Sequence, residues 1–201
     1  MEQKFGINSI DIDALREFCE REGKVVTYRK GDQLEREGDP SRWFAYVESG
    51  CFKYVTHGIS DDKPHITWFS FEGEFAVDYP TFLYGRPSQT TIVAMMPSRV
   101  LRVAGQQLEQ FFNQDKETMK LRAIIAEHIL FQFRSRYLDL HCASPRERYD
   151  LLLQRCRASW SISTCRTSPR SSTSPLKPLA KSAKKSLSGN NSHRFSPKLL
   201  T

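Results

Sequence analysis

The histidines are the side chains in this sequence that are best suited to metal or acid–base chemistry. A jelly roll that binds a metal uses an HxH pair, a Glu and a later His as ligands. Here His57 and His65 are separated by the polar segment GISDDKP, and no HxH occurs. His128 and His141 fall on or just after a predicted long helix, where packing or solvent accounts for them. No Ser/His/Asp or Cys/His arrangement has a supporting context. We therefore predict no catalytic residue and no metal site, and we do not expect an enzyme.

The cysteines and the N-terminal residues indicate the cellular compartment of the protein. The cysteines are odd in number, scattered and without CxxC spacing, which is typical of cytosolic thiols rather than of a disulfide framework. The start MEQKFGINSIDIDAL lacks the basic and apolar regions of a signal peptide. No stretch approaches 18 consecutive apolar residues, so we expect a cytoplasmic protein without a membrane partner. The five cysteines are Cys19, Cys51, Cys142, Cys156 and Cys165.

The formal net charge of +7 is unevenly distributed along the chain. Residues 157–201 hold nine of the 30 Lys and Arg residues and no Asp or Glu. Residues 1–156 therefore hold 21 basic against 23 acidic residues, a net charge of −2. A basic balance usually suggests nucleic acid as a partner, but here it describes only the C-terminal segment.

Residues 24–103 have the pattern of an antiparallel β domain. Turn signals at Gly31, Gly38 and Gly50 recur at intervals of roughly ten residues. WFAYV and CFKYV are strand-like, and the intervening ESG predicts a tight hairpin between them. HITWFSF and TTIVAMMPSRVLRV predict further strands. Many short strands with regular turns favour a sandwich, a barrel or a jelly roll.

Helical periodicity flanks this β region on both sides. SIDIDALREFCERE, residues 9–22, predicts a short helix with acids in its first turn. GQQLEQFFNQ predicts a second short helix. Residues 115–142 predict a long helix for which Asp115 is a candidate N-cap.

The long helix is apolar on more than one side, and a helix of this kind must bury both sides. One side can cover the β domain, and the other is most simply covered by its copy in a symmetric homodimer. Burial wholly within its own chain is the alternative. Its apolar residues include Leu121, Ile124, Ile125, Ile129, Leu130, Phe133, Tyr137 and Leu138. For the dimer helix we predict contacts from Leu121, Ile125, His128 and Ile129.

The segment SPRE indicates that a new helix begins after the long one. Ser144 is a predicted N-cap, Pro145 takes the first helical position and Glu147 completes a capping box. RYDLLLQRC then continues with helical periodicity. A helix that begins with such strong local signals usually opens a second domain.

This order of elements resembles the Crp/Fnr family of bacterial transcription regulators. In YRKGDQLEREGDPSRWFAYVESGCFKYV, the residues Gly31, Gly38, Asp39 and Gly50 occupy positions of the family's "kG", "eGd" and "sG" turns. GEF at residues 73–75 resembles the start of the family's phosphate-binding cassette, and SPRERYDLLL resembles the segment leading into its DNA-binding domain. The resemblance implies a β-roll sensor, a dimer helix and a DNA-binding domain.

The resemblance also implies a ligand pocket. Family members that bind cyclic nucleotide carry a Glu for the ribose and, ten residues later, an Arg for the phosphate. In the best register Asp78 stands at the Glu position and Ser88 at the Arg position, so that the phosphate-binding Arg is absent. Arg86 lies two residues earlier, and its neighbours Gly85 and Pro87 indicate an exposed turn and a surface residue; the alternative is that Arg86 reaches in as the phosphate ligand. We expect no cofactor, weak or no cyclic nucleotide binding, and another small-molecule effector or none. The pocket candidates are Phe75, Ala76, Asp78, Ser88, Gln89, Thr90 and Thr91.

Residues 157–201 do not continue the helix-turn-helix that the resemblance implies. Pro169, Pro175 and Pro178, with many Ser and Thr residues, predict a disordered basic tail. Serine codons of the form TCN, taken one base earlier, give codons for Phe, Leu, Ile or Val. One permitted out-of-frame translation of residues 157–185 resembles the family's helix-turn-helix. We therefore hypothesise a frameshift near codons 155–157, with a genuine disordered tail as the alternative.

Together these patterns predict an α+β fold. We expect an N-terminal helix, an antiparallel β-roll (a jelly-roll-like double-stranded β-helix), a long C-terminal dimerisation helix and a disordered tail. The predicted parts are a sensor domain over 1–114, a dimer helix over 115–142, the start of a DNA-binding domain over 143–156 and a tail over 157–201. The predicted function is a Crp/Fnr-type regulator with no intact DNA-binding residues, although intact relatives bind DNA. The alternative is a stand-alone ligand-binding or interaction module without DNA binding.

Overall fold

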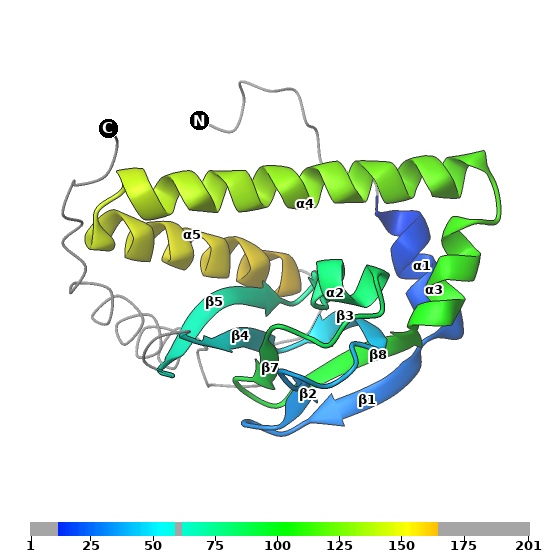
Figure 1. Cartoon of the computed structure of the whole chain (residues 1–201), viewed down its shortest axis with the longest axis horizontal. Helices are drawn as coiled ribbons and strands as arrows, with labels where there is room; N and C mark the ends of the chain where they lie inside the picture. The colour runs from blue at the N-terminus through cyan, green and yellow to red at the C-terminus, as the bar shows by residue number, and fades with distance from the viewer. Residues whose placement is uncertain (1–11, 59–61, 165–201) are drawn as a thin grey trace, which may run out of the picture.

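The computed structural model describes residues 12–58 and 62–164, and its centre is a β-roll of two antiparallel sheets (Figure 1). The strand order is β1-β8-β3-β6 in one four-stranded sheet and β2-β7-β4-β5 in the other. This confirms the predicted α+β fold. The strands are β1 (Lys24–Tyr28), β2 (Gln33–Glu35), β3 (Trp43–Ser49), β4 (Cys51–His57), β5 (Pro64–Phe71), β6 (Phe75–Ala76), β7 (Thr91–Ala94) and β8 (Ser98–Ala104). The helices are α1 (Asp13–Glu22), α2 (Tyr79–Leu83), α3 (Gly105–Phe112), α4 (Lys116–Cys142) and α5 (Pro145–Thr164).

Strand β3 is apolar along most of its length because both of its faces are buried. Phe44 and Tyr46 belong to an outer core that α1 and α3 cover. Ala45 and Val47 point the other way, into the core between the two sheets. A strand buried on both sides has a continuous apolar run instead of an alternating one, and this explains the sequence WFAYV.

The predicted hairpin between β3 and β4 is wrong. β3 pairs with β6 and β8, whereas β4 pairs with β5 and β7, so the chain passes from one sheet to the other at Gly50. Gly50 has φ of 93°, and the amide N–H of Cys51 donates to Ser98 Oγ at 3.3 Å. A Cβ at Gly50 would lie 2.8 Å from the Cα of Ser98. The turn at Gly50 therefore carries the chain from one sheet to the other. The hydrogen bond from Cys51 to Ser98 of β8 holds this turn in place.

The helices α1, α3 and α4 cover the outer face of the first sheet (Figure 1). Phe18 of α1 and Phe111 of α3 stack with ring centroids 4.4 Å apart. Leu121 and Ile125 of α4 pack on the same core. These two residues are predicted to contact a partner helix, and in this chain they also pack, partly buried, on the core under α1 and α3.

Local capping sets the starts of α4 and α5 as predicted. The amide N–H of Thr118 donates to Asp115 Oδ1 at 2.8 Å. The amide N–H of Ser144 donates to Glu147 Oε2 at 2.7 Å, and the amide N–H of Glu147 donates to Ser144 Oγ at 3.3 Å. Because each contact joins residues three apart, the sequence alone could predict both caps.

Helix α5 extends further than predicted. It runs to Thr164, so residues 157–164 are helical although they were assigned to a disordered tail. The segment RASWSIST contains no proline or glycine, and a helix that is already nucleated can continue through it. The remaining tail, residues 165–201, and most of the hypothesised out-of-frame helix-turn-helix lie outside the described residues. Within the described part of the chain, no helix combines the length and the apolarity needed to cross a membrane.

Replacing Gly50 by Ala should strongly destabilise the protein, because the new Cβ meets the Ser98 backbone and φ is in the left-handed region. We expect the free energy of unfolding to fall by about 2–5 kcal/mol, measured by urea denaturation. Gly31→Ala is the control, since Gly31 has φ of 95° but nothing within 4 Å of its Cβ position. It should cost about 1–2 kcal/mol. Equal losses in the two variants would contradict the close approach to Ser98.

Candidate functional site

Asp78 lies just before α2, and its carboxylate is directed at the loop that precedes β7. Asp78 Oδ2 accepts hydrogen bonds from Ser88 Oγ at 3.1 Å and from the amide N–H of Gln89 at 2.9 Å. It does not cap α2, although it occupies the N-cap position. The pairing joins the two residues that the sequence register placed ten apart at the ligand pocket.

Ser88 is almost completely buried, with 3% of its surface exposed. Its backbone pairs with the loop after β2, because Gly38 N–H donates to Ser88 O and Ser88 N–H donates to Asp39 O, both at 2.8 Å. Its hydroxyl lies within donating distance of both Asp78 Oδ2 and Thr90 O. A hydroxyl has one proton, so Ser88 can satisfy only one of these acceptors at a time.

Glu35 brings a second carboxylate to this place, which sequence reasoning missed. Its exposed fraction is 8%, and burial raises its pKa, with a smaller contribution from the negative charge of Asp78. The hydroxyls of Ser88 and Ser41 act on that pKa in the opposite direction. Among the residues that the structure describes, Glu35 Oε1 and Ser41 Oγ find no hydrogen-bond partner. An uncompensated carboxylate in such a setting favours its neutral form.

A register shift explains why Glu35 faces inward. Gln33 pairs with Val93, but Glu35 pairs with the adjacent Ile92, so β2 contains a bulge. A bulge puts two successive residues on one face, and both Leu34 and Glu35 are buried. Simple alternation along QLE predicts an exposed Glu35 beside a buried Leu34, so the sequence had no signal for this residue.

The other pocket candidates are engaged in structural contacts. Thr90 Oγ1 donates to Val55 O at 3.1 Å, and Thr91 Oγ1 accepts from the amide N–H of Glu37 at 3.1 Å. Gln89 is exposed, and its carbonyl accepts a hydrogen bond from Thr56 Oγ1 at 3.3 Å. These hydrogen bonds hold residues 89–91, which lead into β7, against β4 and the loop after β2.

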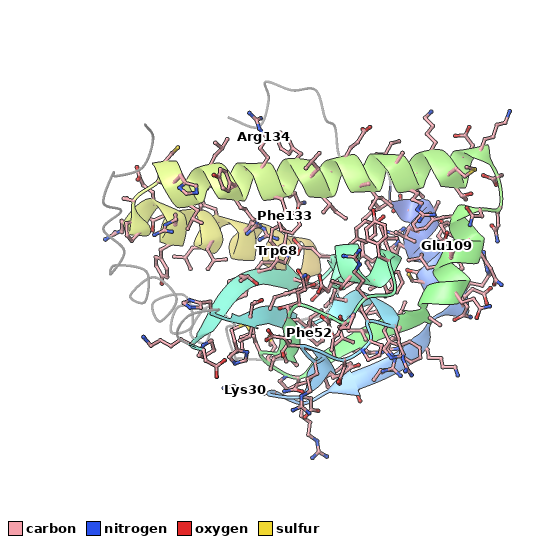
Figure 2. The ribbon with its side chains drawn as sticks, in the orientation of Figure 1. Lys30, Phe52, Trp68, Glu109, Phe133 and Arg134 are labelled. Carbon is pink, nitrogen blue, oxygen red and sulfur yellow. The ribbon has the colours of Figure 1, made fainter. Side chains whose placement is uncertain are left out.

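Phe75 and Ala76 face opposite sides of their short strand. The Phe75 ring packs beside Phe44, with centroids 4.8 Å apart, in the outer core. Ala76 is fully buried and belongs to the core between the sheets, as does Phe52, which Figure 2 labels. The structure therefore brings Asp78 and Ser88 together with Glu35, and it places Phe75 in the core under the helices.

A buried tyrosine holds the segment that carries Asp78. The amide N–H of Val77 donates to Tyr54 Oη at 3.0 Å, Tyr54 Oη lies 3.0 Å from Ser70 Oγ, and Ser70 Oγ donates to Phe75 O at 2.8 Å. Burial raises the pKa of Tyr54, which keeps the phenol neutral and able to donate to Ser70. Residues 75–78 are therefore hydrogen-bonded to the interior of the roll.

At the rim of the roll, His57 Nδ1 lies 2.8 Å from Glu37 Oε2. This hydrogen bond raises the pKa of the exposed His57. No group of three or more His, Cys, Asp or Glu residues suited to a metal ion occurs in residues 12–58 and 62–164. The predicted surface position of Arg86 is confirmed, since its side chain is exposed.

The electrostatics at the Arg position are the reverse of what a phosphate needs. Ser88 stands there, and the carboxylates of Glu35 and Asp78 lie beside it. Within the described chain neither carboxylate forms an ion pair. Asp78 also occupies the N–H of Gln89, a donor of the kind that binds anions. The Asp78 carboxylate thus accepts the hydrogen bond from the Gln89 N–H that a phosphate ligand would need.

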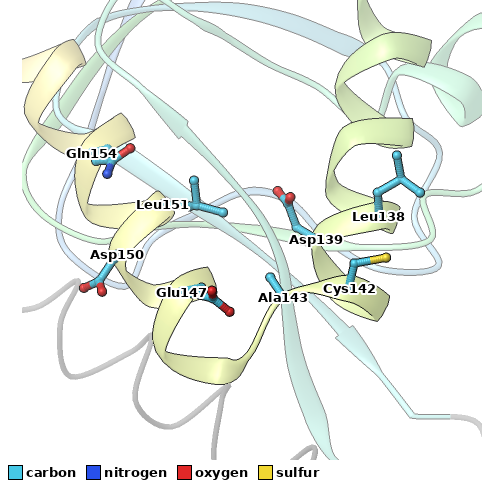
Figure 3. Close-up of a pocket in the computed structure, with 8 residues that line it drawn as sticks. All are labelled: Leu138, Asp139, Cys142, Ala143, Glu147, Asp150, Leu151 and Gln154. Atoms are coloured by element: carbon cyan, nitrogen blue, oxygen red, sulfur yellow. The ribbon is translucent and has the colours of Figure 1, made fainter. Parts of the chain in front are cut away.

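A separate pocket lies between the end of α4 and the start of α5 (Figure 3). Its volume is about 420 Å³. Carboxylates and leucines from both helices line it, among them Asp139, Glu147 and Leu151. Glu147 forms the cap at the start of α5. The pocket therefore lies where the chain turns from α4 into α5.

Comparison with known proteins places the roll in a recognisable fold. Residues 25–115 match the family described as the cyclic nucleotide-binding domain. The c-di-GMP responsive global regulator CLP of Xanthomonas campestris is 17% identical with a TM-score of 0.55, over 72% of this chain and 71% of that one. The N-terminal domain of a transcriptional regulator from Streptomyces coelicolor A3(2) is 19% identical with a TM-score of 0.51, over 63% of this chain and 89% of that one.

A transcriptional regulator from Thermotoga maritima is 18% identical with a TM-score of 0.50, over 65% of this chain and 98% of that one. No curated protein sequence matches significantly. The roll therefore has a cyclic nucleotide-binding-like fold and resembles the sensor domains of Crp/Fnr-type regulators. No DNA-binding domain is evident in the described residues.

Replacing Glu35 by Gln should stabilise the protein at neutral pH. A folded-state pKa above the unfolded value means that this carboxyl group contributes stability at low pH, and that the contribution is lost as the pH rises through the folded pKa. The Gln variant should melt a few degrees higher than wild type at pH 7–8, and the difference should vanish near pH 4, measured by calorimetry.

The partly exposed neighbour Glu37 is the matched control for this substitution. Glu37→Gln should not raise the melting temperature at any pH, because its carboxylate is solvated and hydrogen-bonded to His57. A Glu35→Gln variant that melts below wild type at pH 7–8 would show that the charged form of Glu35 is the stabilising one.

Proposed function

We propose that this chain is the effector-sensing part of a homodimeric Crp/Fnr-type transcriptional regulator whose pocket does not take a cyclic nucleotide phosphate. The observation that carries the proposal is the Asp78 carboxylate on Ser88 and on the N–H of Gln89, where the register calls for a phosphate held by Arg. The order of roll, long helix and capped helix supports the regulator assignment. The effector is a small molecule other than a cyclic nucleotide, or there is none.

Cyclic AMP should bind with a dissociation constant weaker than the micromolar range in isothermal titration calorimetry. The Asp78 carboxylate occupies the Gln89 N–H that a phosphate would need, and in the described residues no fixed cation replaces the missing Arg. The double variant Asp78→Glu/Ser88→Arg restores the family's residue pair and should bind at least about 10-fold more tightly. Micromolar or tighter binding by the wild-type chain would contradict the proposal.

The outward side of α4 supports a homodimer. Seven residues with the alternating spacing of four and three form a single apolar stripe, which is the pattern of a coiled-coil seam. Leu130 and Tyr137 in this stripe are 70% and 63% exposed. So much exposed apolar surface on one helix favours pairing with a second copy. The stripe consists of Met119, Ala123, Ala126, Leu130, Phe133, Tyr137 and Leu140, of which Phe133 is already stacked on Trp68 of β5 and does not face a partner.

Introducing a charge into this stripe should separate the dimer. Leu130→Glu should weaken self-association about 100-fold or more, since it places a carboxylate at the centre of the seam. Ser135→Glu adds the same charge to an exposed α4 residue outside the stripe and should remain dimeric. Mass measured by light scattering after gel filtration distinguishes the two. A monomeric wild type under the same conditions would contradict the dimer.

The competing function is a stand-alone ligand-binding or interaction module without a DNA role. The observation in its favour is that α5 lies against the roll, where Leu152 contacts the side chains of β5. A gel-shift assay with scrambled competitor DNA separates the two functions, because only a regulator binds a specific operator. The frameshift remains a hypothesis, and sequencing the gene across codons 150–190 tests it.

A further inference from the structure

Four oxygen-bearing side chains meet where the loop after β2 approaches the loop before β7. Glu35 lies in the bulge of β2, Ser41 precedes β3, Asp78 precedes α2 and Ser88 precedes β7. Burial raises the pKa of Glu35, whereas the hydroxyls of Ser88 and Ser41 lower it. The negative charge of Asp78 raises it further, so all three neighbours lie close to the Glu35 carboxyl group. We refer to Glu35, Ser41, Asp78 and Ser88 as the oxygen cluster.

The oxygen cluster has more hydrogen-bond acceptors than donors. Ser88 has one hydroxyl proton, although Asp78 Oδ2 and Thr90 O both lie within its donating distance. Both hydrogen bonds that Asp78 accepts end on Oδ2, so Oδ1 accepts none from the described residues. Glu35 Oε1 and Ser41 Oγ are likewise without a partner there, and their residues are only 8% and 7% exposed. Three oxygen atoms are therefore left to accept a hydrogen bond.

Neither charge state of Glu35 satisfies the cluster by itself. When ionised, Glu35 is a buried charge that forms no ion pair in residues 12–58 and 62–164. When neutral, it loses the charge but Oε1 is still without a hydrogen-bond partner. A buried polar group without a partner lowers stability. The cluster therefore favours a ligand that brings both a positive charge and N–H donors.

The cations that border the cluster do not compensate it. The side chains of Arg36, Arg42 and Arg86 are exposed, and in the described part of the chain none forms an ion pair with a carboxylate of the cluster. Asp78 is partly exposed, and its bonded neighbour Gln89 is exposed. A ligand therefore reaches the cluster from the side of Asp78 and Gln89.

Backbone contacts fix the walls of the cluster. Ser88 N–H donates to Asp39 O and Gly38 N–H donates to Ser88 O, both at 2.8 Å, and Pro40 forms an antiparallel bridge with Pro87. These contacts use no side chain of the cluster, so they leave its oxygen atoms free for a ligand. A preformed site binds a small ligand without a large cost of ordering.

Burial limits the ligand to a compact group. Glu35, Ser41 and Ser88 are each more than nine-tenths buried. A calcium ion takes about six to eight oxygen ligands, which exceeds the three oxygen atoms left open here. A primary ammonium group has one positive charge and three N–H donors, which matches these three atoms.

We propose that the oxygen cluster binds the primary ammonium group of a small amine, which donates to Glu35 Oε1, Ser41 Oγ and Asp78 Oδ1. The ammonium group supplies the positive charge that the two carboxylates lack and the donors that the serine hydroxyls cannot provide. The rest of the amine lies toward Gln89, where the cluster meets solvent. The inference rests on the proposed function, because it names the ligand class of the same sensing pocket.

Methylammonium chloride is the probe, and thermal unfolding of the full chain is the measurement. Its dissociation constant should be about 10 mM, because a ligand of two non-hydrogen atoms makes few contacts. At about 100 mM it should raise the melting temperature by about 3 °C or more over the same concentration of tetramethylammonium chloride. Tetramethylammonium has the same charge but no N–H donor, so the comparison separates hydrogen bonding from ionic strength.

Substitutions in the cluster test which side chains hold the probe. Glu35→Gln should weaken methylammonium binding about 10-fold or more, because it removes the buried charge. Ser41→Ala should weaken it about 5-fold, because it removes one neutral acceptor. Glu37→Gln is the control and should keep the wild-type rise in melting temperature, since Glu37 is hydrogen-bonded to His57 at the rim.

Three outcomes would overturn the proposal. The first is an equal melting temperature in methylammonium and tetramethylammonium, and the second is an undiminished rise in the Glu35→Gln variant. The third is a larger rise with magnesium or calcium chloride at the same ionic strength, which would make the cluster a metal site. None of these outcomes affects the regulator assignment, because that is tested by the cyclic AMP titration, the dimer mass and the gel shift.

Discussion

Burial of β3 on both of its faces is the constraint on which the rest of the structure depends. One face needs the second sheet, which closes the roll around Ala45 and Val47. The other face needs a cover of helices over Phe44 and Tyr46, and α1, α3 and the first half of α4 provide it. Because α4 is longer than this cover requires, its second half extends beyond the first sheet and lies beside α5 (Figure 1).

The candidate site shows how one fold can lose an anion site without losing its architecture. A phosphate pocket needs a cation and free N–H donors. Here a serine replaces the cation, and the side chain of Asp78 takes up a donor. The loop after β2 is paired with the loop before β7 through backbone hydrogen bonds of Gly38 and Asp39 with Ser88. The fold alone therefore does not determine a ligand, because the side chains of the site decide which ligands are compatible with it.

The segment from Glu74 to Asp78 links three parts of the molecule. At one end it carries the carboxylate of the pocket, in the middle it is hydrogen-bonded to Tyr54 and Ser70, and at the other end it meets Arg155 of α5.

The sequence by itself determined the features that depend on near neighbours. The caps at Asp115 and Ser144 join residues three apart, and the turn at Gly50 follows from a backbone that glycine adopts most easily. Strand and helix positions followed from the period of the apolar residues, so the α+β fold was predictable. The extension of α5 to Thr164 was missed because Ser and Thr content was given more weight than the absence of helix breakers.

Tertiary structure alone decided which surfaces meet. Gly50 does not close a hairpin because Ser98, 48 residues away, holds the chain between the sheets. Glu35 faces inward because a bulge opposite Val93 shifts the register of β2. The inner side of α4 is set by the core under it, and α5 is held by an ion pair across 81 residues. The physical reason is the distance along the sequence over which each interaction acts. Apolar periodicity and helix capping involve residues a few positions apart. Which face of a strand or helix is buried, and which element it packs against, depends on residues that are far apart in the sequence and meet only in the folded chain.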